Sequence, residues 1–329
     1  AMLLNVGGNQ NTGLGQAALQ HNTTASFNTA VGYQAAFLNT TGTKNTAVGS
    51  NALLSNTTGG YNIALGESAL AANTTGSEST AVGYQAGYSN TTGRITAMGR
   101  HAVKNNTTAV EVTGIGYRAL RDNTTGQYNT AVGGDALIQN TTASNNTAVG
   151  YQSAYNNTTG PRNNSFGAGS LYTNTTGNYN QAIGYQSLRL NTSASYGTAV
   201  GDSALYTNTT GSANTAVGYG SLLLNTTGQH NIAIGAEAMR SNTAASNNTA
   251  VGYQAGYSIT TGDRNIGIGS TALYHTTTGQ GSIAIGFQAL KTASTGDDNV
   301  AIGSDSPTSN AALESLTTGV KNVSVGNNS

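Results

Sequence analysis

The chain has 329 residues, a formal net charge of zero and no cysteine. Only 7% of its residues are charged, against roughly 25% in typical soluble proteins. The neutral balance excludes a charge-driven partner such as nucleic acid or an anionic membrane surface. No apolar run approaches the roughly 20 residues that span a bilayer. Without cysteine, disulfides cannot stabilise the fold.

One glycine recurs at a nearly fixed interval, and we call it the coil glycine. Of the 17 intervals between successive coil glycines, 16 are 17 residues long and one, from Gly83 to Gly99, is 16. A short fixed period is the signature of a solenoid, and frequent Gly, Asn and β-branched residues exclude helices. We therefore predict an all-β, parallel β-solenoid, or β-roll, of about 18 coils. The coil glycines are Gly15, Gly32, Gly49, Gly66, Gly83, Gly99, Gly116, Gly133, Gly150, Gly167, Gly184, Gly201, Gly218, Gly235, Gly252, Gly269, Gly286 and Gly303.

The period divides the chain into three parts. Residues 1–10 are predicted to form a partial N-terminal coil or cap, residues 11–303 the solenoid, and residues 304–329 an inserted loop or cap followed by a final coil. The pattern is already running near the first residue, without a signal peptide. We therefore expect a segment of a longer protein, with any anchor and further C-terminal domain outside it.

Each coil glycine follows a short predicted strand, as in Asn129-Thr130-Ala131-Val132-Gly133. The residue before the glycine is apolar in all 18 coils, the residue two before is small, and the residue three before is mostly Thr. The first and third of these share one face of a period-two strand. We predict that this face points into the core and that the small residue faces outward. The predicted core residues are Val31, Val48, Val132, Val149, Val200, Val217, Ile234, Val251, Ile268, Ile285 and Ile302.

After the coil glycine the pattern predicts a second short strand and then a turn. Ala or Ser always stands three residues after the glycine, and Leu usually stands four after it. Asn-Thr-Thr-Gly follows, as at 56–59, and suits a left-handed turn. Where Ala143, Ala194 or Ala245 replaces the turn glycine, we expect the turn to adopt a different shape.

Two places depart from the pattern. In the 16-residue coil Ile95 takes the usual Asn place, and Val110-Glu111-Val112 stands in the next turn. After Gly303 about six residues are inserted, including Pro307 and the run 311–316, which could form a short helical turn. The insertion is an enlarged loop, a cap, or the transition to a neck that joins subunits.

The core of a single chain is predicted to be small. Each coil offers one Val or Ile, one Leu and a few Ala, which must offset about 1–2 kcal/mol of backbone entropy for each ordered residue. Several chains packed with cyclic symmetry would bury more apolar surface. A monomeric solenoid with a narrow interior remains the alternative.

The repeat resembles a known family. Asn231-Ile232-Ala233-Ile234-Gly235 and Ser282 to Gly286 are similar to the repeat in the YadA-like head domains of trimeric autotransporter adhesins and in related phage-like tail fibres. The resemblance covers about residues 11–303 and returns at 322–326. It implies a left-handed roll, a homotrimer, and an adhesive or spacer role on a surface fibre. The family's coil is shorter, and here Asn-Thr-Thr-Gly lengthens it.

Two tyrosine rows are candidate binding surfaces. The first follows the coil glycine directly: Tyr33, Tyr84, Tyr117, Tyr151, Tyr185, Tyr219 and Tyr253, with Phe287 continuing it. The second stands five residues after the glycine: Tyr88, Tyr155, Tyr172, Tyr206, Tyr257 and Tyr274. Exposed aromatic rows could stack on sugars, whereas tyrosines packed over their neighbours would be structural. We select the second row as the possible surface-binding residues.

No motif predicts catalysis, a cofactor or a metal centre. His21, His101, His230 and His275 occupy different repeat positions, without metal-ligand spacing. The adjacent pair 297–298, both Asp, lies in a predicted turn, where solvated carboxylates are commoner than a calcium site. We expect no enzyme activity, no cofactor and no bound metal.

The sequence therefore favours a non-enzymatic, structural and adhesive segment of a homotrimeric fibre, extracellular, on a cell surface or a virion. Its expected partners are its own copies and an unknown cell-surface glycan or protein, with no nucleic acid and no membrane insertion in this segment. One alternative is an ice-binding or other lattice-binding solenoid, but the Thr three residues before the glycine is predicted to face inward. A glycan-cleaving fibre enzyme is a further alternative and would need a converging carboxylate pair.

Overall fold

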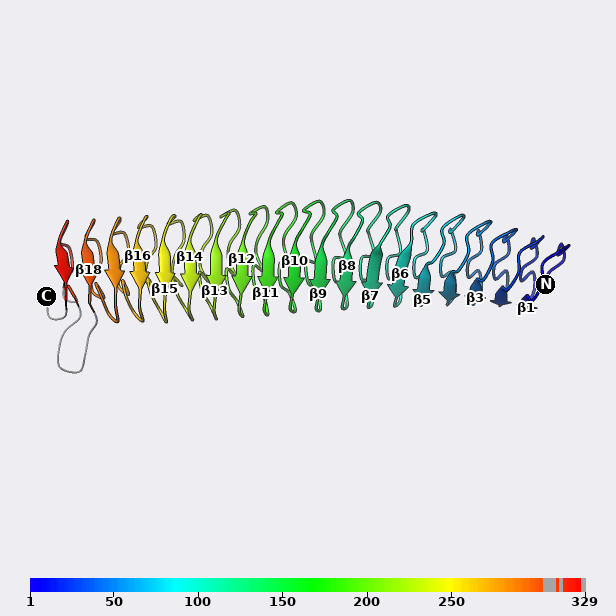
Figure 1. The fold of residues 1–329 in the computed structure, drawn as a ribbon, viewed down its shortest axis with the longest axis horizontal. Coiled ribbons are helices and arrows are strands. Elements are labelled where there is room, and N and C mark those ends of the chain that lie inside the picture. Colours follow the sequence, from blue (N-terminus) through cyan, green and yellow to red (C-terminus); the bar gives the residue numbers. More distant parts are fainter. Residues whose placement is uncertain (304–311, 314–315, 327–329) are drawn as a thin grey trace. The chain divides into compact units, whose positions relative to one another are not determined.

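A computed structural model of the chain describes residues 1–303, 312–313 and 316–326. Within these residues the fold is a parallel β-solenoid with no helix. The chain divides into two compact units, Ala1–Arg162 and Asn163–Ser329. In each unit the strands lie beside one another in chain order, one to each coil (Figure 1).

Within each unit, each strand pairs in parallel with the next strand along the chain, in a register that sets equivalent positions of successive coils opposite each other. Thr29 pairs with Thr46 and Val31 with Val48, for example. The strands of the first unit are β1 (Thr12–Leu14), β2 (Thr29–Val31), β3 (Thr46–Val48), β4 (Ile63–Leu65), β5 (Thr80–Val82), β6 (Ile95–Met98), β7 (Val112–Ile115), β8 (Thr130–Val132) and β9 (Thr147–Val149). Those of the second unit are β10 (Asn164–Phe166), β11 (Gln181–Ile183), β12 (Thr198–Val200), β13 (Thr215–Val217), β14 (Ile232–Ile234), β15 (Thr249–Val251), β16 (Ile266–Ile268), β17 (Ile283–Ile285), β18 (Val300–Ile302) and β19 (Val323–Val325).

The predicted second strand of each coil is wrong, because the residues after the coil glycine form a turn. The residues two and four after the glycine have a left-handed backbone, as at Asn51 (φ 57°) and Leu53 (φ 53°). Left-handed residues cost roughly 1–2 kcal/mol each. Here their N–H groups donate to the adjoining coils: Asn51 to the Tyr33 carbonyl at 2.9 Å and Leu53 to the Ala69 carbonyl at 2.9 Å. The stacked coils thus stabilise a conformation that a strand pattern alone does not reveal.

The strand faces the opposite way from the prediction. The small residue two before the coil glycine is the inward one: Ala131 and Ala216 are fully buried. None of the predicted core residues is buried in the single chain. They are half-buried or exposed, with Val48 37% and Ile234 40% accessible. The residues that were predicted to lie in the core, and that lie on the outward side of the strand instead, are Val31, Val48, Val132, Val149, Val200, Val217, Ile234, Val251, Ile268, Ile285 and Ile302.

The interior holds Ala from the strand, and Ala and Leu from the turn that follows. Ala52, Leu53 and Ala64 are fully buried, and the same places are filled in coil after coil. A coil of one short strand and tight turns encloses too little width for two β-branched side chains. The smaller Ala therefore occupies the inner side of the strand, and Leu fills the remaining width.

The coil glycine recurs because no other residue fits its place. Gly133 has φ 133°, outside the range that residues with a side chain favour. A Cβ there would lie 2.5 Å from the carbonyl oxygen of Gly150 in the next coil. Backbone conformation and the close approach of the next coil both require glycine at this position.

Two columns of buried Asn lie in the interior, each interrupted in a few coils. In one, a turn Asn donates to the turn Asn of the preceding coil: Asn56 Nδ2 to Asn39 Oδ1 at 2.7 Å, and also to its own turn carbonyl at Gly59, 2.9 Å away. In the other, an Asn that opens a strand accepts the backbone N–H of its equivalent in the next coil, as Asn45 Oδ1 does from Asn62 at 2.9 Å. These ladders satisfy polar groups that would be costly to bury unpaired.

The turn after Asn keeps one shape whether it ends in Gly or Ala, contrary to the prediction. The carbonyls of Gly126 and Ala143 accept equivalent bonds at 3.0 Å from Asn123 and Asn140. Ala194 and Ala245 accept the same bond at 3.1 Å. The turn glycine does not have a left-handed backbone in any of these coils. A Cβ on Gly126 would lie 2.2 Å from the Ala143 carbonyl oxygen, so the coils with Ala need a local shift but keep the hydrogen bond from Asn.

The last described coil resumes after the insertion. The Leu290 N–H donates to the Ala312 carbonyl at 3.2 Å, and Leu313 has the left-handed φ (49°) of the other inner Leu residues. Ala312, Leu313 and Leu316 pack with the buried residues of the preceding coils. Pro307 and the rest of the predicted helical run lie outside the described residues.

Candidate functional site: two exposed rows of side chains

The outward side of the strands forms one candidate surface. We call it the strand face: the side chains one and three residues before each coil glycine. No charged residue occupies either row in the coils from Gly15 to Gly303. Both rows leave large apolar side chains accessible, for example Ile63 at 41%, Ile183 at 43% and Ile232 at 41%. A contiguous, uncharged apolar surface of this kind marks an interaction site more often than an ordinary surface.

The aromatic residues that directly follow a coil glycine form a second surface, the outer tyrosine row. Their exposed fractions lie between 40% at Tyr84 and 63% at Tyr219. They occur at alternate coils through most of the chain, and the coil between carries a smaller residue such as Gly134 or Ala236. A Cβ on Gly134 would lie 3.5 Å from Cδ2 of the Tyr151 ring, so the ring lies within van der Waals range of the smaller residue in the preceding coil.

The tyrosines selected from the sequence are less accessible. Tyr88 is 38% exposed, and the other five are half-buried. Their rings pack along the row: the Tyr257 and Tyr274 rings stack with centroids 5.1 Å apart, and the Arg189 guanidinium lies 4.9 Å from the Tyr172 centroid. The binding role assigned to Tyr88, Tyr155, Tyr172, Tyr206, Tyr257 and Tyr274 stays a prediction, but the outer row offers more open ring surface. In the sequence, the outer row differs from the selected row because small residues alternate with its rings.

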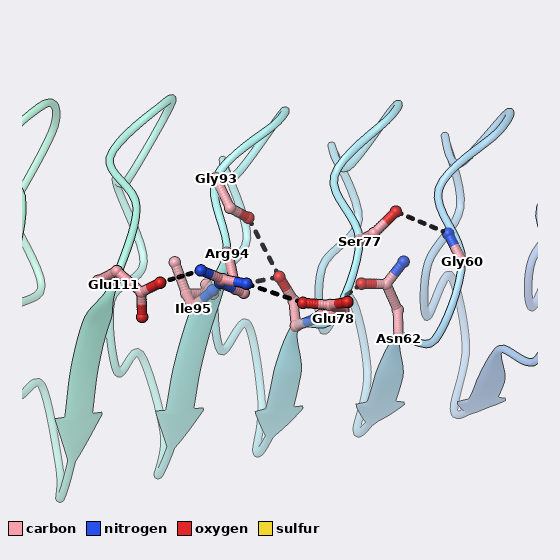
Figure 2. A network of polar contacts seen from close by, with 9 residues as sticks. Gly60, Asn62, Ser77, Glu78, Gly93, Arg94, Ile95 and Glu111 are labelled. Carbon is pink, nitrogen blue, oxygen red and sulfur yellow. Dashed lines mark hydrogen bonds and ion pairs between the residues drawn. The ribbon is translucent and has the colours of Figure 1, made fainter.

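The irregular coil carries an ion-pair ladder. Arg94 lies between Glu78 of the preceding coil and Glu111 of the next, and it bonds to both (Figure 2). Its Nη1 is 2.8 Å from Glu78 Oε2. These side chains are about half exposed, so solvent screens the pairs and they add little to stability. Inside the same coil Ile95 is buried in the place of the strand-opening Asn, and its N–H donates to Ser79 Oγ at 3.2 Å.

A basic cluster lies in the two coils that follow Gly99: Arg100, His101, Lys104, Arg118 and Arg121. Burial, followed by the charges of Lys104 and Arg100, lowers the pKa of His101 below its ordinary 6.5. The His101 ring lies 5.3 Å from that of Tyr84. Arg118 pairs with the buried Asp135 at 2.8 Å, and Arg121 with Asp122 at 2.6 Å. Two of the cluster's four permanent charges are thus paired with carboxylates, while Arg100 and Lys104 lie over the Tyr84 and Tyr88 rings.

Among the described residues, no group of three or more His, Asp or Glu side chains could hold a metal ion. Asp297 Oδ1 instead accepts the Gln280 N–H at 2.8 Å. No helix in the described part of the chain is long and apolar enough to cross a membrane.

No protein-family model and no curated protein matches this chain.

Proposed function

We propose that the chain is a structural and adhesive segment of a homotrimeric surface fibre, with no enzymatic role. The observation that carries the proposal is the strand face, an uncharged row of Val and Ile left accessible along each unit. The predicted core residues would then be buried between chains instead of within one chain. This also accounts for β-branched apolar residues at positions that a monomer would leave in water.

The spacing of the strand face favours a second copy of the chain as its partner. Strands in successive coils lie about 4.8 Å apart, so the apolar side chains repeat at that interval along the face. Only a partner with the same repeat can match many coils at once, and a copy of the same solenoid has it. Closed cyclic symmetry would cover the face on every subunit. The resemblance to trimeric adhesin heads supports three chains and an extracellular, surface-attached fibre.

The role proposed for such a fibre is mechanical. Continuous backbone ladders and interchain packing would make it stiff. Binding would come from weak contacts repeated along the coils and multiplied by avidity. A cell-surface glycan or protein is the proposed ligand. The same stiffness and avidity would serve a fibre on a bacterial surface or on a virion.

The oligomeric state tests the proposal directly. Light scattering coupled to size exclusion should return about three times the 33.1 kDa of one chain at micromolar concentration. A variant with Ile234→Glu and Ile268→Glu places charge on the strand face and should return one chain's mass. Thr227→Glu, at an exposed turn residue, is the matched control and should leave the assembly intact. A single-chain mass for the unmodified protein would refute the trimer.

One observation favours a second candidate function, binding to an ordered water lattice. Eight of the nine strands in the first unit carry Thr three residues before the coil glycine, and the exception is β4, which carries Ile63. The sequence predicted these Thr inward, but they lie on the outward strand face with the Val row. Regular Thr rows on an exposed parallel sheet could order water. Thermal hysteresis from a monomeric chain would support this function over the fibre, because a trimer would cover the same face.

A further inference from the structure

The outer tyrosine row of the second unit is regular enough to suggest a ligand class. Tyr185, Tyr219, Tyr253 and Phe287 are 53%, 63%, 54% and 43% exposed. They follow coil glycines that are two coils apart, so their backbones repeat about every 10 Å at a strand spacing of about 4.8 Å. Since Phe287 has no hydroxyl, the property that all four share is the ring itself.

Small residues between the rings leave room for each ring to lie against the coil. Asp202, Ala236 and Ser270 occupy the intervening positions. In the first unit, where the same alternation occurs, the Tyr151 ring edge comes within 3.5 Å of a Cβ placed on Gly134 while Tyr151 stays 59% exposed. A ring that leans on its neighbour in this way covers one side and turns the other to solvent, which suits stacking.

Amide side chains flank the rings. Gln186, Gln254 and Gln288 follow Tyr185, Tyr253 and Phe287 in the chain, all with left-handed backbones (φ 55°, 53° and 61°). The Gln254 Nε2 donates to Glu237 Oε2 at 2.7 Å, which orients that amide along the surface. An amide offers both donors and acceptors, the chemistry that a row of hydroxyl groups requires.

The charge in the coils of this row nearly cancels. Its carboxylates are Asp202 and Glu237, and the cations five residues after the coil glycines are Arg189, Arg240 and Lys291. Arg240 lies 3.5 Å from Glu237 and donates to the Tyr257 hydroxyl at 3.1 Å, while Arg189 lies over the Tyr172 ring. Both arginines are engaged within the chain, and the surplus over the carboxylates is one lysine, so the surface gives no strong preference for an anionic ligand.

We infer that this row binds a linear, neutral polysaccharide lying along the solenoid, with alternate sugars stacked on successive rings and the glutamines bonded to sugar hydroxyls. The two-coil repeat is close to the length of one disaccharide in an extended β-linked chain, so one register serves all four rings. This inference rests on the proposed adhesive function and names its ligand class.

The probes are cello-oligosaccharides and chitin oligosaccharides of increasing length, with heparin oligosaccharides as the anionic comparison. The chain has no Trp, so tyrosine fluorescence reports binding directly. Affinity for a neutral series should rise with chain length as more rings are engaged. Tyr219→Ala with Tyr253→Ala should weaken it about tenfold or more. Tyr196→Ala is the matched control, because Tyr196 is 61% exposed in a different row of the same unit.

Three outcomes would overturn the inference: no binding of either neutral series, tighter binding of heparin oligosaccharides, or an equal loss of affinity in the Tyr196→Ala control. Light scattering on the same samples separates this result from the fibre proposal. A trimer that binds no neutral glycan refutes only the ligand, whereas a monomer that binds it refutes only the trimer. If the double tyrosine variant changes the mass, the row belongs to the subunit interface instead.

Discussion

Ile95 fills the space that Gly87 leaves in the interior of the same coil. Gly87 stands in the place of the inner Leu, and a Cβ on it would lie 2.7 Å from Ile95 Cδ1. Ile95 stands in the place of a buried Asn and is 2% exposed. Gly256 and Ile259 repeat the relationship at 2.9 Å, with Ile259 in the other Asn column. In these two coils, where Gly replaces the inner Leu, an Ile occupies the interior volume that the Leu would fill.

This compensation predicts strong coupling between the two residues. Gly87→Leu alone should overpack the coil and lower the free energy of unfolding by about 1–3 kcal/mol. Ile95→Asn alone should leave a cavity and cost about 2 kcal/mol or more. The double variant restores the usual Leu and Asn, so its cost should fall short of the sum by about 1 kcal/mol or more. Chemical denaturation of the four proteins measures the coupling, and additive costs would contradict the compensation.

The Asn ladder should depend on each of its members. Asn56 donates to Asn39 and Gly59 and accepts from Asn73 Nδ2 at 2.9 Å. Asn56→Ala takes the donor away from the buried Asn39 Oδ1, which should cost about 1–3 kcal/mol. The Gly59 carbonyl still accepts from Asn45 Nδ2 at 2.8 Å, and Asn73 Nδ2 still donates to the Gly76 carbonyl at 2.9 Å. The thermal midpoint should drop well below that of Thr58→Ala, which changes an exposed residue of the same turn. Equal midpoints for the two variants would show that the ladder adds no stability.

A glycine substitution should be harmless at one alanine and damaging at its neighbour in the same coil. Ala213 has a left-handed backbone (φ 58°), and Gly281 naturally takes the equivalent place with φ 69°. Ala213→Gly should relieve about 1 kcal/mol of strain, which offsets the added entropy of the unfolded chain. Ala216 is fully buried in β13 without such strain, so Ala216→Gly should destabilise by about 1 kcal/mol. Denaturation midpoints would contradict the assignment if the two changes had the same effect.

The lowered pKa of His101 predicts a loss of stability in mild acid. Because burial and the charges of Lys104 and Arg100 lower its pKa in the folded chain, the unfolded chain binds the proton more readily. Stability is therefore highest above the ordinary pKa of 6.5 and falls as the pH drops through it toward the lower folded value. His101→Gln should reduce this decline in unfolding free energy, and Lys104→Gln should reduce it less. An unchanged pH profile in His101→Gln would contradict the assignment.

Much of the fold could be predicted from the periodicity. Seventeen-residue spacing of Gly133 and its equivalents requires stacked coils, and the in-register parallel strands confirm it. The candidate surfaces were predicted less well. Both tyrosine rows were visible in the sequence, but half-burial of Tyr257 and exposure of Tyr219 depend on what the neighbouring coils place beside each ring.

The sequence by itself determined the repeat, its one irregular coil and the alternation along each strand. Only the tertiary structure decided which side of the strand faces inward. Ala131 and Val132 both fit a strand, and period-two alternation has no preferred direction. The decision comes from the left-handed residues after the glycine, such as Asp135 (φ 59°) and Leu137 (φ 49°), which turn the chain back sharply and narrow the interior. A narrow interior admits Ala and one Leu and leaves the β-branched row outside, where another chain can cover it.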